Sequence, residues 1–273
     1  YTTINSANLI LKHTPEISFT NEATRSEVMA NAYFLRAYCY FTLVRVFGDC
    51  PLLTSGFESE KQEDMYPSRT AASEVYAQVE TDIEEALRLM PASSKLLHKA
   101  SPAAINMLRT EYYLWKAKRL GGGNAALSTA QSSVDAVLKA GYTLLPTFAD
   151  IFNLNNEANS ELIWTLPYIV NENVTPGTSP NFFAYYLAPN GDRTRLREAG
   201  YTEDEVPAGS HAQYVVPTQA YCDFLAEDAR DTRTDVSVRV FEDKFLTEEV
   251  QIKRMVVKFK GSFANDTRSF DSD

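Results

Sequence analysis

The stretch from Glu27 to Thr54 constrains the fold of this 273-residue chain most, because it contains a long helix that is apolar on two faces. Its apolar residues recur at spacings of three and four, as they do in an α-helix. A helix that is apolar on both sides must be enclosed by neighbours, so we predict that it lies in the middle of a helical stack. Gly48 and Pro51 predict where it ends. The two stripes consist of Val28, Ala32, Leu35, Cys39, Leu43 and Val46, and of Tyr33, Ala37, Tyr40, Val44 and Phe47.

Two arginines, Arg36 and Arg45, interrupt this apolar surface. A charged side chain on a buried surface must reach solvent or an opposite charge. We therefore expect both arginines to serve contacts between helices, and we predict that Arg36 pairs with a buried carboxylate. Thr20 or Asn21 is the predicted N-cap of their helix.

Further helices are predicted at residues 1–13, 70–90, 102–120 and 125–139 from the period of their apolar residues. Ser101 followed by Pro102 is typical of a helix start. Paired helices without a strict repeat signature indicate a mainly α fold, an irregular tetratricopeptide-like stack. Inward positions are Val75, Val79, Ile83, Ala86, Met90, Ile105, Leu108, Tyr112, Trp115, Ala130, Val134, Val137 and Leu138, whereas Asp82, Glu84, Glu85 and Arg88 are predicted to face water.

The pattern changes at Tyr142, so we predict two parts: a helical stack at 1–141, and a loop-rich ligand-binding part at 142–273 that packs on it. The second part contains a long stretch, 171–213, that is rich in Pro, Gly and Asn and has no sustained period. A helix capped by Thr218 follows, with Tyr221, Phe224 and Leu225 predicted inward. Residues 161–167, 236–241 and 251–260 are predicted strands, which would form a small β element.

No motif for catalysis or metal binding stands out. The three histidines and the three cysteines lack ligand spacing, and no G-x-S-x-G elbow occurs. The chain has 36 acidic residues, so any pair of carboxylates could be chosen and none is informative; Glu203, Asp204 and Glu205 are interpreted as a solvated patch. The net charge of −10 argues against nucleic acid or anionic lipid as partner. We predict a protein without enzymatic activity, cofactor or metal. The residues concerned are His13, His98, His211, Cys39, Cys50 and Cys222.

The long stretch 171–213 holds the predicted ligand-binding residues. It combines clustered aromatic rings with Asn, Asp and Arg side chains. Sugars bind flat aromatic faces through their CH groups, while amides, carboxylates and guanidinium groups bond to their hydroxyls. An alternative is that the rings only pin the loop to the protein body. The predicted residues are Phe182, Phe183, Tyr185, Tyr186, Asn190, Asp192, Arg193, Arg195 and Tyr201.

Several segments together resemble the SusD/RagB family, and the resemblance covers nearly the whole chain. The long helix reads FLRAYCYFTLVRVFGDCPLLT, which is similar to the arginine-bearing segment of that family. The first helix, YTTINSANLILKH, and the segment RTAASEVYAQVETDIEEALRLMP resemble its neighbouring helices. YTLLPTFADIFNLNNEANSELIWTLPY and the corner DARDTR resemble later family segments. The chain is expected to be an internal portion of such a protein.

The resemblance implies a function that the residues alone do not. Proteins of this family are outer-membrane surface lipoproteins of Bacteroidetes that bind nutrients, mostly glycans, and pass them to a SusC-like TonB-dependent transporter. It therefore implies an oligosaccharide ligand, a SusC-like partner and a membrane attachment only through a lipid anchor outside this chain. A peptide-binding member of the family is an alternative. A helical-repeat scaffolding protein and a glycan-active enzyme are the others.

Overall fold

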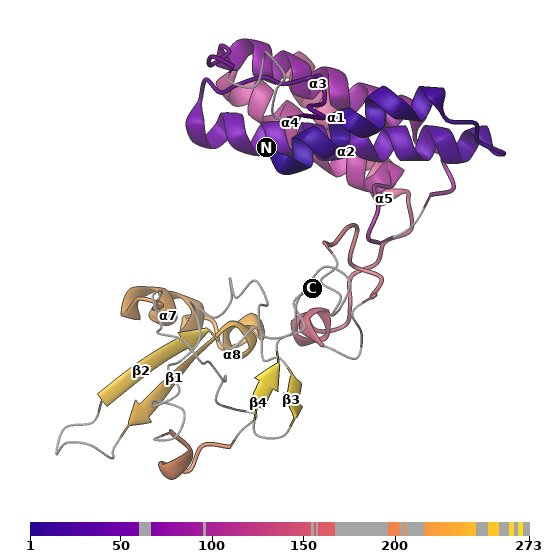
Figure 1. The fold of residues 1–273 in the computed structure, drawn as a ribbon. Helices are drawn as coiled ribbons and strands as arrows, with labels where there is room; N and C mark the ends of the chain where they lie inside the picture. The colour runs from indigo at the N-terminus through magenta and orange to yellow at the C-terminus, as the bar shows by residue number, and fades with distance from the viewer. Residues whose placement is uncertain are drawn as a thin grey trace. The chain divides into compact units, whose positions relative to one another are not determined.

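The computed structural model describes residues 1–59, 67–94, 97–153, 156, 158–166, 196–202, 205, 216–243, 251–256, 262–264 and 267–269. The chain divides into two compact units (Figure 1). Unit 1 comprises Tyr1–Tyr142 and Leu162–Thr165, and unit 2 comprises Thr143–Glu161 and Leu166–Asp273. No helix in the described ranges combines the length and the hydropathy that a membrane span needs.

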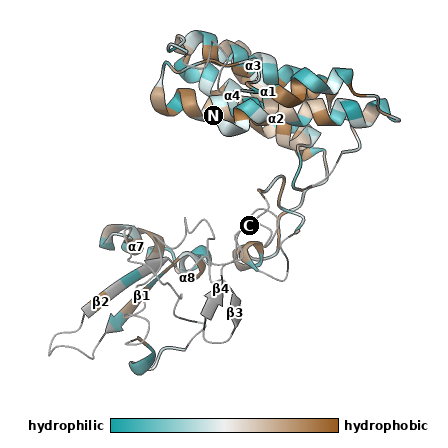
Figure 2. Cartoon of the chain, viewed as in Figure 1, coloured by the Kyte–Doolittle hydropathy of each residue, from teal (hydrophilic) through white to brown (hydrophobic). Residues whose placement is uncertain are grey.

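Unit 1 is a stack of helices, which confirms the predicted mainly α, tetratricopeptide-like fold. Each helix packs on the next along the chain, and α2 also contacts α4, so α2 is the central helix as predicted. In Figure 2 every helix of this unit carries both hydrophobic and hydrophilic residues, as helices with one buried face do. The elements are α1 (Thr2–His13), the 3-10 turn η1 (Thr14–Glu16), α2 (Glu22–Phe47), α3 (Ala72–Leu89), α4 (Pro102–Arg119) and α5 (Gly123–Leu138).

The core of unit 1 lies where α2, α3 and α4 meet. Its largest fully buried side chains include Tyr40, Phe41, Ile83, Ile105 and Tyr112. Aromatic rings pack edge to face there, and the ring centroids of Phe41 and Tyr112 lie 5.7 Å apart. The predicted inward row of α3 is confirmed, because Val75, Val79, Ile83, Ala86 and Met90 are all buried.

The predicted inward orientation is wrong for three residues. Val46 and Phe47 in the last turn of α2 are 67% and 64% exposed, and Leu138 at the end of α5 is 73% exposed. Phe47 lies seven residues after the buried Tyr40 on the same helix face, yet it is exposed, whereas Val44 in the same last turn is buried. Periodicity identifies a face and does not show how far along the helix its cover extends.

The helix ends follow their sequence signals. Asn21 caps α2, with its Oδ1 accepting a hydrogen bond from the Ala23 amide at 2.8 Å. Gly48 ends the same helix with a φ of 66°, a conformation that favours glycine. The buried Ser101 caps α4, and its Oγ accepts from the Ala104 amide at 3.1 Å.

Replacing Ser101 with alanine is expected to lower the free energy of unfolding by about 1 kcal/mol, because a capping hydrogen bond is lost at a buried helix start. Urea unfolding monitored by circular dichroism measures the change. Ser128 is the control, since it is exposed within α5 and its hydroxyl bonds only to the carbonyl of Asn124. Ser128→Ala is expected to stay within about 0.5 kcal/mol of the wild type. Equal losses in the two variants would contradict the capping role.

Unit 2 contains short helices and two antiparallel strand pairs. The strand β1 pairs with β2 in a register that runs from Val238 opposite Val256 to Asp243 opposite Gln251. At the corner before β1, Arg230 and Arg233 pair with Asp228 and Asp231. The elements are η3 (Phe148–Phe152), α7 (Gln219–Ala226), α8 (Arg233–Ser237), β1 (Val238–Asp243), β2 (Gln251–Val256), β3 (Ser262–Ala264) and β4 (Thr267–Ser269).

The structure corrects several predictions in unit 2. The first strand starts at Val238, because residues 236–237 complete helix α8. Residues 161–166 form turns and irregular backbone instead of a strand. Helix α7 is capped by Thr218 as predicted, but Tyr221 and Phe224 are 49% and 65% exposed, and its buried residue is Cys222. An eight-residue helix offers too few positions for periodicity to identify its buried face.

Candidate functional site

The predicted ligand-binding stretch, 171–213, is described by the structure only near its C-terminal end. All the predicted site residues except Tyr201 lie outside the described residues. They are Phe182, Phe183, Tyr185, Tyr186, Asn190, Asp192, Arg193 and Arg195. Their assignment therefore stays a prediction.

Tyr201, within this stretch, contacts strand β1. Its ring meets the buried Phe241 edge to face, with centroids 5.0 Å apart and an interplanar angle of 85°. Its hydroxyl accepts a hydrogen bond from the Glu242 amide at 3.2 Å, and its own amide donates to the carbonyl of Leu196 at 3.0 Å. Leu196 is fully buried. The backbone from Leu196 to Tyr201 is thus held next to β1 by packing and hydrogen bonds.

An ion pair strengthens the same attachment. The guanidinium of Arg239 on β1 lies 2.6 Å from Glu205 Oε1, while Glu205 Oε2 accepts from the amide and the hydroxyl of Thr202. The hydrogen bonds from Thr202 and then that from Arg239 lower the pKa of Glu205. Glu203 and Asp204 lie outside the described residues, whereas Glu205, interpreted from the sequence as part of a solvated acidic patch, keeps a partly exposed side chain and also forms this ion pair. Its partner is 34 residues away in sequence, beyond any local pattern.

A buried ion pair joins the first three helices of unit 1. Arg36 on α2 donates to both carboxylate oxygens of Asp82 on α3, at 2.8 and 2.7 Å, and to Asn8 Oδ1 on α1 at 2.8 Å. The predicted pairing of Arg36 with a buried carboxylate is confirmed. Asp82, predicted to face water, is fully buried, and Gln78 donates to it as well. Burial raises the pKa of Asp82, and the Arg36 guanidinium offsets part of that rise.

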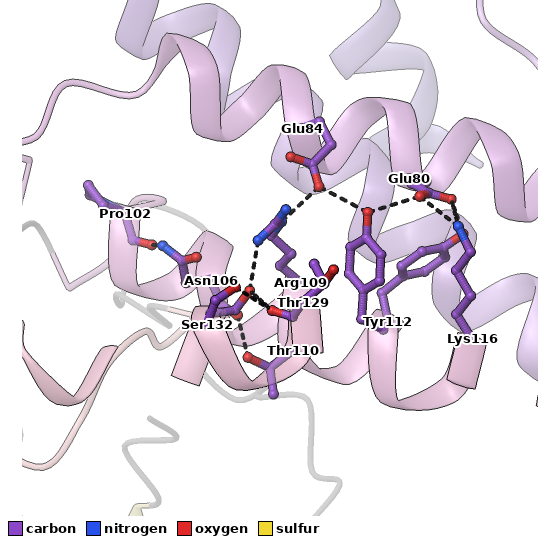
Figure 3. A network of polar contacts seen from close by, with 12 residues as sticks. Glu80, Glu84, Pro102, Asn106, Arg109, Thr110, Tyr112, Lys116, Thr129 and Ser132 are labelled. Carbon is purple, nitrogen blue, oxygen red and sulfur yellow. Dashed lines mark hydrogen bonds and ion pairs between the residues drawn. The ribbon is translucent and has the colours of Figure 1, made fainter. Parts of the chain in front are cut away.

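A second polar network joins α3 to α4 and α5 (Figure 3). Lys116 Nζ lies 2.7 and 2.6 Å from the two oxygens of Glu80, and Arg109 donates to Glu84 at 2.7 Å. Arg109 Nη1 also donates a hydrogen bond to Ser133 Oγ on α5, at 3.0 Å. Tyr113 lies between the two cations, with its ring centroid 5.2 Å from Arg109 Cζ and 5.4 Å from Lys116 Nζ.

Burial and hydrogen bonding within the second network shift the pKa values of its ionisable groups. Burial would raise the pKa of Glu80, but hydrogen bonds from Lys116, Tyr113 and Tyr112 lower it below its usual value. Burial, followed by contact with Glu80, raises the pKa of Tyr112 and of Tyr113 far above that of free tyrosine. Every charged group of this network has a partner on a neighbouring helix, so the network joins helices rather than offering a reactive group to a substrate.

Glu80→Gln is expected to lower the free energy of unfolding at pH 7 by about 1–2 kcal/mol, because Lys116 loses its charged partner. A pKa lowered by folding stabilises the fold above the usual carboxyl pKa of 4.5, and this contribution disappears as the pH falls through the folded pKa. The difference between variant and wild type is therefore expected to shrink below about pH 4. Unfolding in urea between pH 3 and 7 measures it.

The matched control is Glu85→Gln, because Glu85 pairs with Arg88 on the exposed side of the same helix. Its effect is expected to stay below about 0.5 kcal/mol at every pH. A pH-independent loss in Glu80→Gln would mean that packing, not the carboxylate charge, is responsible.

The described histidines are held in side-chain contacts. His13 lies beside Glu58 and Glu16, and His98 Nδ1 lies 3.2 Å from the hydroxyl of Thr165. His211 lies outside the described residues. Within the described part of the chain, no three His, Cys, Asp or Glu side chains come together in a way that could hold a metal ion.

The amino-acid sequence of the chain is similar to those of known proteins. A SusD-like family model described as "Starch-binding associating with outer membrane" matches residues 1–113. SusD-like protein P38 of Formosa agariphila is 32% identical over 210 residues, which are 70% of this chain and 38% of that relative. SusD-like proteins P25 and P2 of the same organism match as well, and the chain spans only 31% and 43% of their lengths.

Solved structures of the same superfamily share the fold. The crystal structure of a SusD superfamily protein from Bacteroides vulgatus has a TM-score of 0.83 and 27% sequence identity, and the match covers 98% of this chain and 56% of that chain. A laminarin binding SusD-like protein has a TM-score of 0.50 and 26% identity over 59% of this chain and 34% of that one.

Proposed function

Because this chain belongs to the SusD-like family, we propose that it is part of a surface protein that binds oligosaccharide or polysaccharide without chemistry and delivers it to a SusC-like TonB-dependent outer-membrane transporter. The observation that carries the proposal is the match of residues 1–113 to a family described as starch-binding and associated with the outer membrane. The laminarin binding relative supports glycan as the ligand class.

The two units would divide this work. Unit 1 supplies a rigid helical body, in which the charged networks around Arg36 and Glu80 join helices. Unit 2 supplies the stretch 171–213, in which Tyr201 and Glu205 contact β1. The aromatic and polar residues between 182 and 195 are the proposed contacts for sugar rings and hydroxyls.

The proposed partner is a SusC-like transporter, and the proposed location is the outer surface of the outer membrane, with attachment through a lipid anchor. The net charge of −10 is unsuited to nucleic acid and to anionic lipid headgroups. Co-purification of the complete protein with a barrel transporter from its native membrane tests the partner. Recovery from the membrane fraction without any such barrel would count against it.

A glycan array probed with the complete protein tests the ligand class, followed by calorimetry with laminarin and starch oligosaccharides. We expect heat of binding for at least one glycan and none for a mixture of unstructured peptides. Binding of peptides alone would instead identify a peptide-binding member of the family. Turnover of a bound glycan would overturn the non-catalytic part of the proposal.

A further inference from the structure

A polar pocket lies on unit 1, between α1, α2 and the segment that follows Pro51. Its volume is about 450 Å³, within the range of roughly 300–1,000 Å³ typical of small-molecule sites. It is formed entirely by residues of unit 1, so it is separate in sequence from the stretch 171–213. The lining residues are Asn8, Leu11, Lys12, Tyr33, Arg36, Thr54, Ser55 and Gly56.

The wall formed by residues 53–57 is held in place before any ligand arrives. Asn8 Nδ2 on α1 donates to the carbonyls of Leu53 and Ser55, at 2.9 and 3.1 Å. One turn earlier, Asn5 exchanges two hydrogen bonds with the backbone of Phe57. These side chains fix the segment against α1 along its length. A pocket that is already formed binds its ligand without a cost for ordering its walls.

Gly56 allows the close approach of this wall to α1. A Cβ atom at residue 56 would lie 2.6 Å from Leu9 Cδ2 and 3.0 Å from the Leu9 amide nitrogen, closer than side-chain carbons come to other atoms. The absence of a side chain at residue 56 therefore sets the shape of the pocket.

The charges of the pocket have one sign. Lys12 and Arg36 line it, and no acidic residue is among its lining residues in the described part of the chain. Their partners Glu58 and Asp82 are outside the lining set, at 3.1 Å from Lys12 Nζ and 2.7 Å from Arg36 Nη2. The two charged side chains among the described lining residues are therefore both cationic, in a chain whose net charge is −10.

Donors remain for a ligand. A guanidinium has five N–H groups, and the bonds from Arg36 to Asp82 and Asn8 use three of them. The side chain of Lys12, whose ammonium group pairs with Glu58, is 47% exposed. The ring of Tyr33 stands beside Arg36, whose Cζ lies 5.4 Å from the ring centroid.

From this arrangement, we propose that the pocket binds a small carboxylate-bearing sugar residue, with the carboxylate toward Lys12 and Arg36 and the sugar ring toward Tyr33. A carboxylate matches the two cations and the unspent N–H groups, while an aromatic face suits the CH groups of a sugar. The volume accommodates one sugar residue. This site would be additional to the glycan contacts proposed for the stretch 171–213.

Calorimetry and NMR titration of the full chain with glucuronate, glucose and succinate test the proposal. We expect glucuronate to bind more tightly than either glucose, which lacks the carboxylate, or succinate, which lacks the ring. Lys12→Gln is expected to weaken glucuronate binding about 5- to 10-fold, because one charge-assisted contact is lost. Lys139→Gln, which removes an exposed lysine outside the pocket, is expected to leave it unchanged.

Equal affinity for glucuronate and glucose, or an unchanged affinity in Lys12→Gln, would overturn the proposal. Equal affinity for glucuronate and succinate would overturn its sugar component. Tyr33→Leu provides a second variant, which is expected to reduce the preference for glucuronate over succinate. If the protein binds glycans on the array but does not prefer glucuronate, only the proposal for the pocket is refuted. If it prefers glucuronate but binds no glycan on the array, only the proposed function is refuted.

Discussion

Replacing Arg36 with methionine is expected to lower the free energy of unfolding by about 3–5 kcal/mol, the typical result of removing one partner of a buried ion pair. The variant leaves the fully buried Asp82 carboxylate without its two guanidinium bonds. It also removes the donor to Asn8 Oδ1, so the loss extends to α1. Urea unfolding followed by circular dichroism measures the change.

Arg88→Met is the matched control. Arg88 also pairs with a carboxylate on α3, but its side chain is 64% exposed and that of its partner Glu85 is 36% exposed. Solvent screens such a pair, so the expected loss is only about 0–1 kcal/mol. Combining Arg36→Met with Asp82→Leu removes the unpaired charge and is expected to recover part of the stability. Similar losses in Arg36→Met and Arg88→Met would contradict a structural role for the buried pair.

The triple variant Phe182→Ala, Tyr185→Ala, Tyr186→Ala is expected to lose most of the affinity for the glycan that the array identifies. If each ring contributes about 0.5–1.5 kcal/mol beyond the area it buries, three rings change the dissociation constant by roughly 10- to 1,000-fold. Calorimetry on the complete protein measures the affinity, and the melting temperature shows whether the fold is intact.

Phe224→Ala is the control for the triple variant, because Phe224 is an aromatic residue of unit 2 that is 65% exposed on α7. Its glycan affinity is expected to equal that of the wild type. An unchanged affinity in the triple variant would show that these rings are not the binding residues. A lowered melting temperature together with unchanged affinity would favour the alternative that the rings pin the loop to the protein body.

Sequence patterns identified the helices of unit 1 because each carries a long apolar row and a recognisable end. The row from Val75 to Met90 and the cap at Ser101 are local signals, and both are confirmed. The sequence pattern places Asp82 on the wrong side of α3, because a carboxylate close to Glu84 and Glu85 is predicted to face water. Only the packing of α2 against α3 brings Arg36 to it, from 46 residues away.

The candidate site depends more heavily on such distant contacts. The binding residues between 182 and 195 are predicted from the chemistry of their side chains alone, and they lie outside the described residues. The attachment of Tyr201 to Phe241 and Glu242 joins residues about 40 positions apart, so no local pattern could predict it. A signal for the pocket was present in α1, where Asn5 and Asn8 lie three residues apart on one face. Asparagine is a poor helix former, and such a pair indicates bonds to another segment.

The contacts of Arg36 also determine how unit 1 opens. One side chain on α2 bonds to α1 and to α3, so neither neighbour can detach without exposing a buried charge or breaking its bonds. Native-state hydrogen exchange is therefore expected to report α1, α2 and α3 as one cooperative unit, whose amides exchange in a single step of high free energy. The last turn of α2, with the exposed Val46 and Phe47, is expected to exchange earlier by fraying.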